Sequence, residues 1–98
     1  MDILNKYKNE LTSFCKANKI KKLSLFGSYL MNTAKFDSDI DFLVEFEIDS
    51  EYGLLDVSRI QRELSEILGR KVDLRTPEEL SRYFRDSVIR EAQIKYEA

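Results

Sequence analysis

The chain has 98 residues, which is enough for one compact domain around one core, and we expect residues 1–98 to form a single domain. Hydrophobic residues make up 43% and charged residues 35%, and no apolar run approaches the roughly 20 residues of a membrane-spanning helix. The net charge of −2 offers no basic excess for phosphate neutralisation, so neither a membrane nor a nucleic-acid partner is expected.

Two absences narrow the chemistry further. The chain contains no histidine, so histidine acid–base catalysis and histidine metal sites are excluded. Cys15 is the single cysteine, which excludes thiolate zinc sites and an internal disulfide. A bound metal must therefore have oxygen ligands, as Mg²⁺, Mn²⁺ and Ca²⁺ do. The lone thiol and a charged N-terminus without a leader pattern predict a cytoplasmic protein.

Local patterns predict the elements of the first third of the chain. Apolar residues recur at three- and four-residue spacing over residues 2–18, which indicates a helix. Residues 22–26 alternate and end at Gly27, as a strand entering a turn does. Residues 28–33 follow as a short helix with Ser28 at its N-cap.

Residues 39–46, with the sequence DIDFLVEF, are the clearest strand. Successive side chains of a strand point to opposite faces, so this stretch separates into an apolar face and a face that begins with two acids. The apolar face holds Ile40, Phe42, Val44 and Phe46, and the other face holds Asp39, Asp41, Leu43 and Glu45.

The second half predicts a helix, a strand and a further helix. Residues 54–68 carry a helical apolar stripe, and its expected core positions are Leu54, Val57, Ile60, Leu64 and Ile67. Residues 71–75 form a short strand with Asp73, and a helix-start signal at 76–79 predicts a helix to Ile94 or beyond, with a break near Asp86-Ser87 left open. This order indicates an α+β fold with a small mixed β-sheet and helices packed on one face.

The acids on these strands suggest a metal site. Asp39 and Asp41 point the same way and repel each other unless a cation or water screens them. If the strand of Asp73 pairs beside theirs, three carboxylates meet on one surface. This is the donor set of two-ion phosphoryl transfer.

Gly27 and Ser28 add a second element, because a strand followed by Gly-Ser at a helix start presents N–H groups and a hydroxyl to an anion. Taken alone, the pair is an ordinary turn and N-cap, and the acids are an ordinary solvated strand start. A calcium loop starting at Asp37 is excluded, because Phe42 replaces its glycine and Ile48 its bidentate glutamate.

Gly27-Ser28, ten residues, and then Asp39-Ile40-Asp41 resemble the signature of the DNA polymerase beta-like nucleotidyltransferase superfamily, and the chain's size and ending resemble its minimal nucleotidyltransferase branch. The resemblance implies that Asp39, Asp41 and Asp73 hold Mg²⁺, with two ions expected, and that Gly27 and Ser28 bind the outer phosphates of ATP. Active relatives carry Ala-Arg-Gly where this chain has Leu30-Met31-Asn32, and Lys35 is the cation expected to replace that arginine in part.

Members of this branch pair with a HEPN-domain ribonuclease toxin and serve as its antitoxin. The resemblance therefore implies a Mg²⁺-dependent transfer of AMP from ATP to a hydroxyl, expected to be a tyrosine, of such a toxin. The alternative is a non-catalytic antitoxin that masks the toxin and keeps a vestigial nucleotide site, and a further alternative is transfer to RNA or an antibiotic. The sequence leaves open the partner, the acceptor residue, the preferred base and the stoichiometry.

Overall fold

The structure is a computed structural model that describes residues 5–27, 39–83 and 85–98. The predicted helix at 28–33, together with Ser28 and Lys35, lies outside the described residues. The elements are α2 (Lys8–Ala17), β1 (Ile20–Phe26), β2 (Ile40–Phe46), α3 (Leu54–Leu68), β3 (Val72–Arg75), the 3₁₀ turn η1 (Pro77–Glu79), α4 (Arg85–Glu91) and β4 (Gln93–Glu97).

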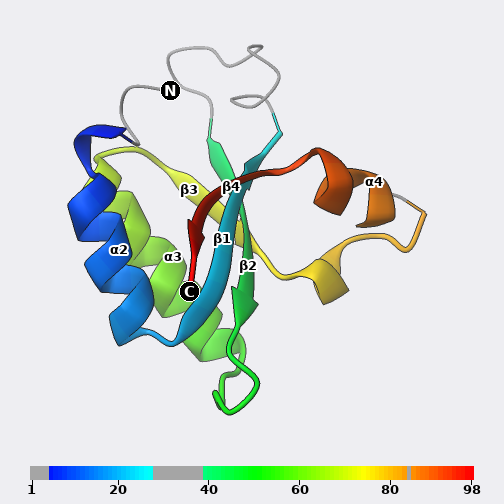
Figure 1. Ribbon diagram of the computed structural model, residues 1–98, viewed down its shortest axis with the longest axis horizontal. Helices are drawn as coiled ribbons and strands as arrows, with labels where there is room; N and C mark the ends of the chain where they lie inside the picture. Colours follow the sequence, from blue (N-terminus) through cyan, green and yellow to red (C-terminus); the bar gives the residue numbers. More distant parts are fainter. Residues whose placement is uncertain (1–4, 28–38, 84) are drawn as a thin grey trace.

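The four strands form one mixed sheet in the order β3-β2-β1-β4. β1 pairs antiparallel with β2 and β4, whereas β2 and β3 are parallel. Parallel neighbours need a crossover, and α3 is that connection. Figure 1 shows α2 and α3 together on one side of the sheet and α4 on the other side. The predicted α+β class with a small mixed sheet is confirmed, and α2 and α3 pack on one face as expected, whereas α4 lies on the other (Figure 1).

The core lies between the sheet and the two helices α2 and α3. The predicted apolar face of β2 is confirmed, since Ile40, Phe42 and Val44 are fully buried. From α2 the core receives Leu11 and the thiol of Cys15. The buried positions of α3 are Val57, Ile60, Leu64 and Leu68, with Ile67 packed at the margin. In the described parts of the chain, no helix is long and apolar enough to cross a membrane.

The expected burial of Leu54 is wrong. This side chain is 81% exposed, and its neighbour Leu55 is 87% exposed. Leu54 is the first residue of α3, and burial along this helix begins one turn later, at Val57. The helical stripe continues to Leu54 in the sequence, but this first turn has too little of the sheet and of α2 against it to bury the side chain.

The predicted helix from residue 76 to Ile94 is also wrong in extent. The chain makes only η1 and α4 there, and Leu80 between them has an extended backbone. The last residues form β4, whose Tyr96 lies opposite Leu23 of β1 and packs against the core. Pairing with the open edge of β1 satisfies backbone groups of that strand, which outweighs the helical preference of the local sequence.

A lysine also connects the last strand to the sheet. The Lys22 ammonium lies 3.7 Å from a carboxylate oxygen of Glu45 on β2 and 3.8 Å from one of Glu97 on β4. These three residues stand side by side on adjacent strands, since Lys22 is the register partner of both glutamates. These two half-buried ion pairs contribute little stability by themselves, but they favour the observed register.

Candidate functional site

The three predicted acids lie at one end of the sheet on two adjacent strands. Asp41 of β2 is the register partner of Asp73 of β3, and Asp39 directly precedes β2. Ile40 and Phe42 point into the core, so strand alternation turns Asp39 and Asp41 to the opposite face. The sheet pairing thus brings together the carboxylates that the sequence places 32 residues apart, at positions 41 and 73.

Asp41 is the electrostatic centre of this group. Its pKa is raised above the usual aspartate range, first by burial and then by the negative charges of Asp73 and Asp39, while Arg75 acts in the opposite direction. A carboxylate surrounded by like charges is stabilised by any cation that enters between them. The site therefore favours a bound cation on electrostatic grounds.

Two cations already accompany the outer acids. The Arg75 guanidinium spans both oxygens of Asp73, with Nε 3.2 Å from Oδ1 and Nη2 donating to Oδ2 at 3.4 Å. Arg75 also lies 3.6 Å from Glu79 of η1. At the other end of β3, the Lys71 ammonium is 3.8 Å from Asp39. These ion pairs partly neutralise the acids and leave Asp41 between them.

The residues fit a hard divalent cation by their chemistry, since carboxylate oxygens are the ligands that Mg²⁺ prefers. Within residues 5–27, 39–83 and 85–98, however, no three acidic or cysteine side chains converge as a ready-made metal cage. In this arrangement Asp39 pairs with Lys71, directly before β3, and Asp73 pairs with Arg75 of β3. Metal binding would require these contacts to loosen.

Gly27 lies directly against the Asp41 carboxylate. Its backbone has φ of +77°, in the left-handed region that side chains disfavour, and an added Cβ would collide with the Asp41 side chain. The antiparallel pairing of β1 with β2 places Phe26, the residue before Gly27, opposite Asp41. The predicted turn at Gly27 is confirmed, and it lies next to the Asp41 side chain. A phosphate-binding role for Gly27, Ser28 or Lys35 stays a prediction.

Arg75 and Lys71 were not singled out by the sequence reasoning, although a signal was present. In "KVDLR" the two basic residues stand two positions before and two after Asp73, so all three share one face of the strand. Side chains two residues apart in a strand point the same way, so Lys71 and Arg75 are expected on the same face of the sheet as Asp73.

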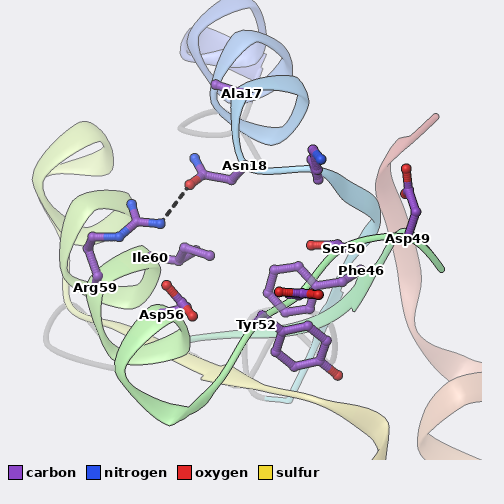
Figure 2. Close-up of a pocket in the computed structure, with 11 residues that line it drawn as sticks. Ala17, Asn18, Phe46, Asp49, Ser50, Tyr52, Asp56, Arg59 and Ile60 are labelled. Atoms are coloured by element: carbon purple, nitrogen blue, oxygen red, sulfur yellow. Dashed lines mark hydrogen bonds between the residues drawn. The ribbon is translucent and has the colours of Figure 1, made fainter.

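A cavity of about 390 Å³ lies at the other end of the sheet, and none of the three aspartates lines it. It is bordered by the end of β2, the loop 47–53 and the first half of α3 (Figure 2). Arg59 crosses it to donate a 3.0 Å hydrogen bond to the Asn18 side chain. This cavity holds no converging carboxylates on neighbouring strands, so the acid end of the sheet remains the candidate catalytic site.

Comparison with known proteins gives a consistent assignment. The profile of the family described as "Nucleotidyltransferase domain" matches residues 7–96. A Methanocaldococcus jannaschii protein, provisionally named a protein adenylyltransferase, is 37% identical over 89 residues, covering 91% of this chain and 94% of its own. The protein adenylyltransferase MntA of Thermococcus cleftensis is 38% identical over 73 residues, which cover 74% of this chain and 71% of the relative.

Solved structures agree on the fold. A provisionally assigned minimal nucleotidyltransferase aligns with a TM-score of 0.77 and 33% identity over 93% of this chain and 91% of its own. A toxin–antitoxin structure with AMP-PNP has a TM-score of 0.75 at 22% identity, over 93% and 73% of the two chains. A Shewanella oneidensis complex of a tri-AMPylated HEPN toxin with its MNT antitoxin gives 0.69 at 20%, over 97% and 73%. At these last two identities the likeness shows the fold.

Proposed function

Because this chain belongs to the nucleotidyltransferase domain family, we propose that it is a protein adenylyltransferase that transfers AMP from ATP to a hydroxyl of a HEPN toxin. The transfer would neutralise the toxin, which makes this chain the antitoxin of the pair. Since ATP is the donor, the reaction belongs in the cytoplasm.

The observation that carries the proposal is the pairing of Asp41 with Asp73 across two parallel strands, with Asp39 on the same face. A structural role would be served as well by uncharged polar residues, without the burial of a charge and the repulsion that together raise the pKa of Asp41. The similarity to protein adenylyltransferases over most of the chain supports the same reaction. The partner is supported by the AMPylated HEPN toxin held by the Shewanella antitoxin, which has the same fold.

In the proposed reaction, the acceptor hydroxyl oxygen bonds to the α-phosphorus of ATP, and the bond from that phosphorus to the bridging oxygen of the β-phosphate breaks. Pyrophosphate leaves with the bond's electron pair. The Asp73 carboxylate, at the exposed edge strand β3, accepts the hydroxyl proton. Gly27 and Ser28 would bind the outer phosphates, and Lys35 would contribute positive charge.

Asp39, Asp41 and Asp73 would hold Mg²⁺, with two ions as the expected number. The metal would supply positive charge for the phosphate oxygens and for the departing pyrophosphate. Lys71 and Arg75 would release Asp39 and Asp73 as this charge arrives, since each now pairs with one of these acids.

The test uses purified HEPN toxin, Mg²⁺ and ATP labelled either at the α- or at the γ-phosphate. Transfer of AMP labels the toxin from the α-position only, and chelation of Mg²⁺ with EDTA ends it. Asp73→Asn keeps the side-chain shape and should remove labelling, whereas Asp86→Asn, at an exposed acid of α4, should not. Labelling from the γ-position, or full labelling by the Asp73 variant, would overturn the proposal.

A further inference from the structure

Apolar side chains are exposed together where β2 passes into α3. Ile48, Leu54 and Leu55 are 97%, 81% and 87% exposed, and Tyr52 is 43% exposed. We call these four residues the loop patch. Single exposed apolar residues are common, but four within eight consecutive positions are typical of an interaction surface. The patch lies at the end of the sheet away from the three aspartates (Figure 1).

Local contacts hold this segment in place. The Tyr52 ring stacks on Phe46, with centroids 4.0 Å apart and planes 26° apart, as Figure 2 shows. Ser50 N–H donates to the Glu47 carbonyl at 2.9 Å, and Gly53 N–H donates to the Asp56 carboxylate at 2.9 Å. An ordered segment loses little conformational freedom on binding, so its exposed apolar area contributes more of its burial energy to affinity.

Acidic residues surround the patch, and their negative charge indicates which kind of partner is complementary to it. Four acids stand in or beside it, namely Glu47, Asp49, Glu51 and Asp56. Two cations border the cavity of about 390 Å³ that Tyr52 also lines, namely exposed Lys19 and Arg59. Arg59 is already engaged with Glu63 at 2.6 Å and with Asn18, so acids remain in excess. A second copy would place acid against acid in a symmetric interface, and RNA would be repelled. The complementary partner is a protein with an apolar groove and a basic rim.

The patch continues toward the catalytic face of the sheet. Tyr52 borders the 390 Å³ cavity and also a groove of about 230 Å³ that contains Glu45 and Ile89. Glu45 shares the β2 face of Asp41, four residues away, which is about 14 Å at the rise of a strand. The patch thus adjoins the Glu45 end of this face, whereas Leu43, between Glu45 and Asp41, is buried under other parts of this chain.

From this arrangement we infer that the loop patch is the docking surface for the toxin, separate from the acids that transfer AMP. The inference rests on the proposed function for the identity of the partner. In this inference the toxin binds through the loop patch, and AMP transfer takes place at the opposite end of the sheet. The acidic rim would steer a basic toxin surface toward the patch, so binding should weaken as salt increases.

The test compares wild type with the double variant Leu54→Ser/Leu55→Ser, with Glu51→Lys, and with the control Tyr83→Ser. Tyr83 is 80% exposed but lies outside the patch. Toxin affinity is measured by calorimetry at low and high salt, AMP transfer by steady-state kinetics, and folding by thermal unfolding. The double variant should weaken toxin binding about tenfold or more, with the loss in KM rather than kcat and an unchanged melting temperature. Glu51→Lys should weaken binding mainly at low salt, and the control should match wild type.

If the double variant binds the toxin with unchanged affinity, the docking inference is overturned, but the adenylyltransferase proposal is not affected. It would also be overturned if wild type does not bind the toxin, or if sedimentation shows a wild-type dimer that the double variant dissociates. Patch-dependent binding without any AMP transfer would support the docking surface and refute the adenylyltransferase proposal alone.

Discussion

The contact between Gly27 and Asp41 links the fold to the site, and the chain's three glycines allow it to be measured. Gly27→Ala meets two obstacles, a left-handed backbone and a collision with the Asp41 carboxylate. The backbone conformation costs an alanine about 1–2 kcal/mol. Overpacking against a neighbouring side chain adds about 1–3 kcal/mol, so the expected loss of unfolding free energy is about 2–5 kcal/mol.

Two control substitutions separate these contributions. Gly69 also has a positive φ, of +65°, but no atom within 4 Å of an added Cβ, so Gly69→Ala should lose only the backbone part. Gly53 has neither obstacle and should tolerate alanine. Repeating Gly27→Ala in an Asp41→Ala background removes the carboxylate, and the loss should fall toward that of Gly69→Ala.

The assay is urea unfolding, with stability read from the midpoint at an unchanged slope. If Gly27→Ala and Gly69→Ala lose the same free energy, Asp41 does not lie against Gly27 in solution and the described site geometry is wrong. A loss that persists in the Asp41→Ala background would place the obstacle elsewhere.

Three further predictions concern stability and reactivity. Leu64→Ala should cost about 2–5 kcal/mol in urea unfolding, since Leu64 is fully buried, whereas exposed Leu54→Ala should cost little; equal costs would contradict the helix orientation. Asp41→Asn should raise the melting temperature of the metal-free protein near pH 7. The raised pKa of Asp41 means that its protonated form stabilises the fold at low pH and that this stability is lost as the pH rises through the folded-state pKa. The advantage of Asn should therefore shrink in acid, and a pH-independent difference would argue against the cause given. Burial raises the pKa of Cys15 to about 12, so a thiol reagent at pH 8 should modify it only in denaturant; rapid labelling of the native protein would show that α2 is not packed as described.

Much of the site follows from alternation along strands. Period-two spacing turns Asp39 and Asp41 away from Ile40 and Phe42, and the structure places these residues accordingly. The pairing of Asp41 with Asp73 could be stated only as a condition, because the register of parallel strands depends on contacts distant in sequence. Strand alternation also places Arg75 on the same face as Asp73, so their ion pair could have been predicted from the sequence.

The C-terminal region shows where local patterns fail. Residues 93–97 contain good helix formers, yet they form β4 because β1 offers an open edge and Tyr96 finds a place at the core. The prediction that Leu54 is buried fails for a related reason, because the helical stripe does not show how far along α3 the neighbouring elements extend. Both outcomes depend on what neighbouring elements cover, and the sequence of one element does not contain this information.

The most direct test of the central claim is the intact mass of HEPN toxin co-expressed with this chain, read together with the toxicity of the same cells. The account predicts that wild type adds the mass of AMP at one or more hydroxyls and relieves toxicity. Asp73→Asn should do neither, while Asp86→Asn behaves as wild type. Toxin of unmodified mass in cells that wild type has rescued would contradict the account, because neutralisation would then come from masking alone.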